Sequence, residues 1–202
     1  MTEQHRLALK HLRSNDPVMK AIIRDVGPFT LRTDRDRFRM LVRSIISQQI
    51  STGAARSIRQ RLEELTAPDG FTAASLVRFS PEQLRSAGVS PQKAKYILDL
   101  AVKVQDGNVD LRQIGRFSDE RVIEQLTTVK GIGRWTAQMF LIFSLGRLDI
   151  FPHDDLGVRS AIRDRYGLGE LPDKETSCVI ADKWRPYASV ASWYCWRSLD
   201  VK

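Results

Sequence analysis

The chain has 202 residues, a length that fits one domain or two small lobes and excludes a large multidomain assembly. Hydrophobic residues make up 42% of it and charged residues 28%, a composition that supports a buried core and argues against intrinsic disorder. The formal net charge is +8, so a polyanion such as nucleic acid is the first partner to consider.

The two cysteines, Cys178 and Cys195, lack the CxxC spacing of zinc and iron–sulfur sites, so we expect no such metal centre. No apolar run approaches the ~18 residues that a membrane span needs, and the N-terminal segment has no apolar signal-peptide core. These features predict an intracellular protein with reduced thiols and no membrane partner. It would be cytoplasmic in a prokaryote and nuclear in a eukaryote.

Helix start and stop signals recur along the chain, whereas the alternation typical of strands is nearly absent. Asp16-Pro17 predicts a helix over residues 18–26, which Gly27-Pro28 ends, and residues 29–31 are expected to link helices rather than build a sheet. An apolar stripe with helical spacing follows, and the chain is predicted to bend after it, where Ser51 or Thr52 caps the next helix. The stripe consists of Phe38, Leu41, Val42, Ile45, Ile46, the polar Gln49, and Ile50.

The second half of the chain has the same kinds of helix start and stop signals. Further helices are predicted to start at Ser80-Pro81, Ser90-Pro91 and Ser118, followed by an almost wholly apolar helix over residues 137–145. Asp154 opens another helix, which Gly167 ends, and the last helix begins near residue 186. The sequence therefore predicts an all-α fold without repeats.

Residues 129–137 read VKGIGRWTA and join two of the predicted helices. Gly131 and Gly133 permit a tight turn with backbone conformations closed to other residues, while Ile132 plugs the turn into the core. The N–H groups of the turn lie at the start of the next helix, where they and the helix dipole can bind a phosphate oxygen without reading base sequence. Lys130 and Arg134 add positive charge. The alternative is that the glycines merely cap helices.

Residues 151–156 read FPHDDL and lie downstream of this hairpin. Paired aspartates at a helix start can serve simply as an N-cap that complements the helix dipole. His153 has two open roles, shaping the loop or contacting a phosphate group. The two segments become more informative when they are taken together.

A Gly-Ile-Gly-Arg-Trp-Thr-Ala hairpin followed by Pro-x-Asp-Asp strongly resembles the helix-hairpin-helix (HhH-GPD) DNA glycosylase superfamily, and most closely its alkylpurine branch, of the 3-methyladenine DNA glycosylase II type. Residues 43–51 are similar to the family's early helix and intercalating loop, and residues 184–197 to its C-terminal segment, so the resemblance covers residues 15–198. The chain looks like the compact form without an N-terminal β-domain. The resemblance implies a two-lobed helical fold with the active-site cleft between the lobes. Residues 38–146, with the hairpin, form one lobe, and residues 1–37 with 147–202 form the other.

The resemblance also implies roles for single residues. Asp155 matches the catalytic aspartate, whose carboxylate stabilises the positive charge that develops on the sugar as the N-glycosidic bond breaks, and Asp154 matches the neighbour that caps the helix. Gln49 matches the side chain that intercalates where a base has been extruded; the alternative is that it bonds the backbone at the helix bend. The expected DNA backbone-binding residues are Lys130, Gly131, Gly133, Arg134 and Thr136.

Three tryptophans, Trp135, Trp193 and Trp196, are the expected walls of the substrate pocket, because electron-rich indoles stack on a flat, cationic alkylated base. Trp135 and Trp196 match pocket tryptophans of the family. Trp193 and Trp196 lie three residues apart on a helix face that is away from the apolar stripe of that helix. The alternative is that the tryptophans are core residues, as is expected for Trp184.

The expected activity is that of a monofunctional glycosylase that hydrolyses the N-glycosidic bond of alkylated purines, such as 3-methyladenine and 7-methylguanine, in double-stranded DNA during base excision repair. Bifunctional relatives place a nucleophilic lysine where this chain has Trp135, so no lyase chemistry is expected. No cofactor is required, relatives bind Na⁺ or K⁺ at the hairpin carbonyls, and a monomer is expected. Two alternatives stay open: a non-catalytic helix-hairpin-helix protein for DNA binding or damage search, and a basic helical scaffold for protein interactions.

Overall fold

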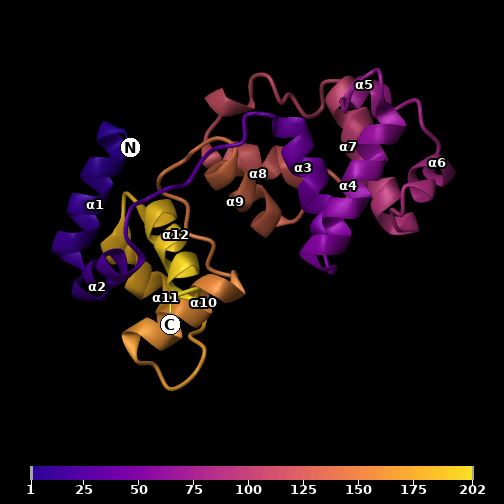
Figure 1. Ribbon diagram of the computed structural model, residues 1–202. Helices are drawn as coiled ribbons and strands as arrows, with labels where there is room; N and C mark the ends of the chain where they lie inside the picture. The colour runs from indigo at the N-terminus through magenta and orange to yellow at the C-terminus, as the bar shows by residue number, and fades with distance from the viewer. Residues whose placement is uncertain (1, 202) are drawn as a thin grey trace. The chain divides into compact units, whose positions relative to one another are not determined.

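The computed structural model describes residues 2–201, and Figure 1 shows the course of the chain. Regular structure in this range is helical throughout, without a strand. The helices are α1 (Glu3–Asn15), α2 (Pro17–Val26), α3 (Arg37–Ser47), α4 (Thr52–Thr66), α5 (Ala73–Leu76), α6 (Pro81–Ser86), α7 (Pro91–Gln105), α8 (Asp119–Thr127), α9 (Arg134–Phe143), α10 (Leu156–Tyr166), α11 (Lys174–Ala181) and α12 (Ala188–Ser198), with the 3-10 turns η1 (Ile114–Arg116) and η2 (Asp182–Trp184). The all-α prediction is confirmed. None of the described helices has the length and apolar character that a membrane crossing requires.

The chain divides into two compact units. The terminal unit comprises the residues up to Thr33 together with those from Leu141 onward, and the hairpin unit spans Asp34–Phe140. Helix α9 begins in the hairpin unit, and its last turn belongs to the terminal unit. The lobe expected over residues 38–146 corresponds to the hairpin unit, which the structure bounds at residues 34 and 140.

In the terminal unit, α12 packs against α1, α2 and α10. Because neighbours enclose it, α12 has no exposed polar face along most of its length, and an amphipathic stripe cannot be assigned to it. Its buried residues are Ala188, Ser189, Val190, Ala191, Ser192, Trp193, Tyr194, Cys195 and Ser198.

A buried carboxylate joins three elements of the terminal unit. Asp16 is 1% exposed and accepts the N–H groups of Val18 and Met19 at the start of α2, at 2.9 and 3.1 Å. It also accepts the indole N–H of Trp184 at 3.1 Å and the hydroxyl of Tyr166. Burial, followed by the hydrogen bond to Asp16, raises the pKa of Tyr166, so its hydroxyl stays a donor. Trp184 is fully buried here, which confirms its expected place in the core.

In the hairpin unit, α7 packs against α3, α5 and α6. Helix α3 contributes the first part of the predicted stripe to the core, and each of these side chains is at most 9% exposed: Phe38, Leu41, Val42, Ile45 and Ile46.

Polar caps begin most helices where they were predicted. The side chains of Ser51, Ser80, Ser90 and Ser118 each accept the backbone N–H three residues further on, and Asp16 caps α2 as expected. Sequence reasoning did not predict α1, α5 or α11.

Candidate active site

The hairpin lies between α8 and α9. Ile132 is 4% exposed, and its N–H donates to the Val129 carbonyl at 3.1 Å, so it plugs the turn into the core as predicted. Gly131 has φ +80°, and a Cβ at this position would lie 2.1 Å from Cδ2 of Tyr96. Both the backbone conformation and the close contact with the Tyr96 ring therefore require glycine at position 131.

Gly133 is under no such constraint. Its φ lies outside the left-handed region, and an added Cβ would meet no atom within 4 Å. The prediction that both glycines adopt conformations closed to other residues is therefore right for Gly131 and wrong for Gly133. Gly133 is exposed and immediately precedes α9, whose first N–H groups have no partner within the helix. This arrangement suits an anion at the helix start.

The polar residues of the hairpin have different surroundings. Lys130 is exposed, and its backbone N–H donates to Oδ2 of Asp99 at 2.9 Å. Arg134 donates two hydrogen bonds to Glu120, at 2.6 and 3.1 Å, so a phosphate group would compete with that ion pair. Thr136 is 5% exposed, which limits any phosphate contact to its backbone N–H in the first turn of α9.

The turn after α3 departs from the predicted stripe. The helix ends at Ser47, Gln49 has φ +55° and is exposed, and Ile50 is 37% exposed. The placement of Gln49 and Ile50 on the buried face of α3 is therefore wrong, although the predicted bend over residues 48–52 is confirmed. Within residues 2–201, Gln49 is the only non-glycine residue with a positive φ.

Gln48 makes the kind of backbone hydrogen bond that was considered for Gln49. Its Nε2 donates to the carbonyl of Gly131 at 2.9 Å and so ties the turn to the hairpin. The side chain of Gln49 makes no hydrogen bond to any residue that the structure describes. Gln49 is therefore exposed, on a turn that the hydrogen bond of Gln48 ties to the hairpin. We name residues 48–50 the wedge turn.

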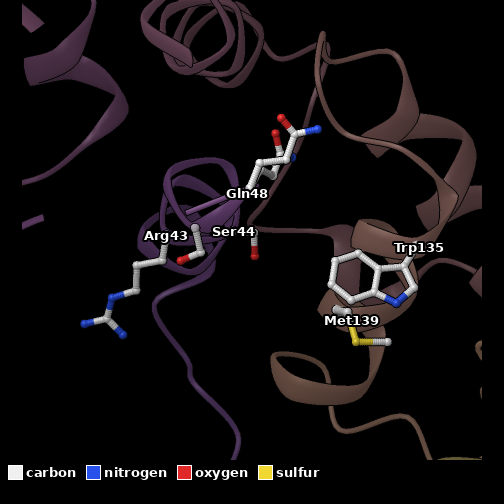
Figure 2. A pocket seen from close by; sticks show the side chains of 7 residues that line it. Arg43, Ser44, Gln48, Trp135 and Met139 are labelled. Carbon is white, nitrogen blue, oxygen red and sulfur yellow. The ribbon is translucent and has the colours of Figure 1, made fainter. Parts of the chain in front are cut away.

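A pocket of about 560 Å³ opens in the hairpin unit between the end of α3 and the start of α9 (Figure 2). Figure 2 shows Trp135 and Met139 together on α9, across from Ser44 and Gln48. Trp135 is 45% exposed and is the indole that lines this pocket. Sequence reasoning missed five lining residues, Arg43, Ser44, Ser47, Gln48 and Met139.

The second group of predicted residues lies in the terminal unit, where Asp155 caps α10. Its Oδ1 accepts the N–H of Val158 at 2.8 Å, and the side chain is largely buried, with 8% of the residue exposed. The prediction that Asp154 is the helix cap is therefore wrong. The helix begins at Leu156, one residue later than Asp154 would require, so only Asp155 reaches the N–H group of Val158.

Asp154 is instead an exposed residue of the loop before α10. Its side chain is 67% exposed, and its Oδ2 lies 3.1 Å from Nε2 of His153, whose side chain is 14% exposed. The contact places His153 within the loop before α10 and supports a loop-shaping role for it.

Trp196 contacts Asp155 directly. Its indole Nε1 donates to Oδ1 of Asp155 at 2.8 Å, and its ring packs on Phe143 with the ring centres 5.5 Å apart. A Cβ added to Gly157 would lie 3.0 Å from Cδ1 of Trp196 and 3.1 Å from Oδ1 of Asp155. Sequence reasoning missed Gly157 and Phe143, which create the space and the support for the indole.

Trp193 is a core residue. It is 8% exposed and makes edge-to-face contacts with Phe29 and Tyr194, with ring centres 4.8 and 4.9 Å apart. Its predicted role as a pocket wall is therefore wrong. The structure thus groups the other predicted residues in two sets: Asp155 with Trp196 in the terminal unit, and Trp135 and Gln49 with the hairpin in the other.

Comparisons with known proteins connect these two sets to one family. The model of the HhH-GPD superfamily base excision DNA repair proteins matches residues 42–186. The chain is 31% identical to an alkylbase DNA glycosidase-like protein of Schizosaccharomyces pombe, over 96% of this chain and 93% of that protein. It is 32% identical to DNA-3-methyladenine glycosylase 1 of the same organism, over 93% of this chain and 85% of that one.

Solved structures with a similar fold carry the same kind of name as the sequence relatives. The fold matches the Schizosaccharomyces pombe 3-methyladenine DNA glycosylase in complex with abasic DNA, with a TM-score of 0.82, 32% identity and 94% of each chain covered. It matches a DNA-3-methyladenine glycosidase from Bacillus halodurans with a TM-score of 0.85 and 37% identity, over 94% of this chain and 87% of that one. The hairpin, the capping aspartate and the helical architecture have a common explanation: this chain belongs to the HhH-GPD superfamily of base excision DNA repair proteins.

Proposed function

We propose that this chain is a monofunctional DNA glycosylase that hydrolyses the N-glycosidic bond of alkylated purines in double-stranded DNA. The observation that carries the proposal is the carboxylate of Asp155, which is largely buried, caps α10 and accepts the indole N–H of Trp196. The names of its relatives, among them DNA-3-methyladenine glycosylase 1, support alkylated purines as the substrate class.

The chemistry needs a fixed negative charge more than it needs an acid. Breaking the N-glycosidic bond builds positive charge on the sugar, and a preorganised carboxylate stabilises that charge and can orient the attacking water. An alkylated purine that already carries a positive charge leaves as a neutral base, so little protonation by the enzyme is required. Two donors, the Val158 N–H and the Trp196 indole, hold Asp155 Oδ1 in place.

The pocket that Trp135 lines supplies recognition. An exposed indole attracts a flat cationic base by stacking and by cation–π interaction, without a demanding hydrogen-bond pattern. Trp135 occupies the position where bifunctional members of the superfamily carry a nucleophilic lysine, so the reaction ends at an abasic site and the DNA strand stays intact.

DNA is held and opened by the hairpin unit. The N–H groups at Gly131, Gly133 and the start of α9 bind phosphate oxygens, assisted by the charge of Lys130. An enzyme that acts on a base in duplex DNA has to extrude it, and Gln49, exposed on the wedge turn, fills the gap that remains.

The activity requires no cofactor. A Na⁺ or K⁺ ion at the hairpin carbonyls fits the residues present: the Val129 and Gly131 carbonyls each accept one hydrogen bond, from Ile132 and Gln48, and each carbonyl oxygen has a second lone pair. Bound there, the ion would add positive charge beside the phosphate group. The protein acts as a monomer. It is located with the DNA of the cell, in the cytoplasm of a prokaryote or in the nucleus of a eukaryote.

The test is to incubate the protein with methylated duplex DNA, to chromatograph the released bases, and to examine the strands before and after treatment with hot alkali. The expected result is free methylpurines and strands that break only after alkali. A protein that binds the DNA and releases no base would contradict the glycosylase and favour a non-catalytic DNA-binding protein. Strand cleavage without alkali would contradict the monofunctional mechanism.

A further inference from the structure

The wedge turn is held by a residue from another helix. Lys93, in the first turn of α7, donates from its Nζ to the carbonyls of Ile46 and Gln48, at 2.8 and 2.5 Å. Its own backbone N–H is fixed by the side chain of Ser90 at 3.3 Å. These contacts join α7 to a segment that precedes it by more than forty residues.

The chemistry of these contacts suits a cation. The last carbonyls of a helix have no partner within it and carry the negative end of the helix dipole, so an ammonium group is a favourable partner. Burial lowers the pKa of Lys93, whereas the two hydrogen bonds that its ammonium group donates favour the charged form. The partly buried ammonium group of Lys93 therefore restrains the carbonyls at the end of α3.

The carbonyl of Gln48 belongs to the peptide group that leads into Gln49. The orientation of this peptide group constrains the ψ of Gln48 and the φ of Gln49 together. The φ of Gln49, +55°, lies in a region that a non-glycine residue occupies only when its surroundings hold it there. Because the Gln49 side chain has no hydrogen bond to the described residues, the conformation of the turn sets the direction in which this side chain leaves the backbone.

A second set of contacts ties the wedge turn to the hairpin. Gln48 donates to the Gly131 carbonyl, and the ring of Tyr96, one turn along α7 from Lys93, lies against Gly131. The same residues line a hollow of about 380 Å³ beside Gln49. The first two turns of α7 therefore contact both the segment that would enter the duplex and the segment that would bind its backbone.

We propose that Lys93 is a positioning residue for base extrusion, which holds the wedge turn so that Gln49 points outward before DNA binds. The inference rests on the proposed intercalation by Gln49. It assigns Lys93 no contact with substrate or with the reacting atoms. Its effect is preorganisation: a turn that is already in shape loses less conformational freedom when Gln49 enters the duplex.

The test compares single-turnover excision of one methylated base in duplex and in single-stranded DNA, where the base is already unstacked. Lys93→Met should lower the duplex rate about tenfold and leave the single-strand rate within about twofold of wild type. Lys93→Arg, which keeps a cation with several donors, should recover most of the duplex rate.

Lys95→Met is the matched control, because Lys95 lies on the same helix and is exposed. Thermal unfolding shows whether each variant folds. If Lys93→Met does not fold, the ratio of the duplex rate to the single-strand rate is compared between Lys93→Arg and the wild type.

A double-mutant cycle with Gln49→Ala shows whether Lys93 acts through Gln49. If it does, Lys93→Met adds little to the loss in duplex rate that Gln49→Ala causes alone. Equal losses of both rates in Lys93→Met, an unchanged duplex rate, or losses that multiply in the double variant would each overturn the proposal. If Gln49→Ala keeps the wild-type duplex rate, the intercalation itself fails. If Gln49→Ala loses the duplex rate and Lys93→Met does not, only the role of Lys93 fails.

Discussion

At the scale of single residues, the two hairpin glycines differ in how well they should tolerate substitution. A side chain at position 131 would clash with the Tyr96 ring and would sit on a backbone with an unfavourable φ, whereas a Cβ at position 133 would have no atom within 4 Å. We expect Gly131→Ala to lower the free energy of unfolding by about 2 kcal/mol or more, and Gly133→Ala to change it by less than about 0.5 kcal/mol. Urea unfolding measures both values. Equal losses of unfolding free energy in the two variants would contradict the requirement for glycine that the φ of Gly131 and its contact with Tyr96 impose.

The indole N–H of Trp196 is a second test at this scale. Trp196→Phe keeps a ring against Phe143 but loses the hydrogen bond to Asp155. Because the carboxylate then loses the indole donor, we expect single-turnover excision to fall about tenfold on duplex and single-stranded DNA alike.

Trp193→Phe is the control for that experiment. Trp193 lies in the core against Phe29 and Tyr194, so its variant should lose stability and keep the excision rate of the folded protein. A wild-type rate in Trp196→Phe would mean that the hydrogen bond to Asp155 does not serve the reaction.

The sequence predicts the residues of the site better than their contacts. Asp154 and Asp155 are equal candidates for the cap by type, and only the start of α10 at Leu156 decides between them. Lys93 could not be predicted, because no local pattern reports that its ammonium group reaches carbonyls at residues 46 and 48.

At the scale of elements, local chemistry predicts helices that begin with a strong cap, such as those after Ser51 and Ser118. Helix α1 was missed because it buries only Ala8, Leu9 and Leu12, too sparse a set for a clear stripe. The error at Trp193 has the opposite cause. Helix α12 is enclosed on almost every side, so the spacing of its residues does not separate core positions from pocket positions.

The link between α7 and the hairpin should depend on pH. Burial alone would raise the pKa of Asp99, but the hydrogen bonds from the Lys130 N–H and from Lys103, with the charges of both lysines, hold that pKa below its ordinary value. A carboxyl whose pKa is lower in the folded state stabilises the fold above its unfolded pKa of about 3.9, and that contribution is lost as the pH falls through the folded pKa.

We therefore expect Asp99→Asn to lower the free energy of unfolding at pH 7 by about 1–2 kcal/mol. The difference from wild type should shrink when urea unfolding is repeated near pH 3. A difference that does not change between these two pH values would contradict a stabilising role for the ionised carboxylate.

At the scale of the whole molecule, the net charge of +8 predicts that affinity for undamaged duplex falls as the salt concentration rises. Lys130→Ala should make the slope of log affinity against log salt shallower by about one, since one phosphate contact is lost. Arg134→Ala should have a smaller effect, because Arg134 already pairs with Glu120. Binding titrations over a range of salt concentrations decide the point, and an unchanged slope in Lys130→Ala would contradict the phosphate contact.

The central claim is that Asp155 supplies the charge on which the reaction depends, and a comparison of Asp155→Asn with Asp154→Asn tests it most directly. Asparagine still caps a helix, so Asp155→Asn should fold and bind DNA while its single-turnover excision of a methylated base falls about 10²–10³-fold. Asp154→Asn should keep a rate close to that of wild type, because the Asp154 side chain is 67% exposed and lies against His153. A wild-type excision rate in Asp155→Asn, or a folded but inactive Asp154→Asn, would contradict the assignment of Asp155.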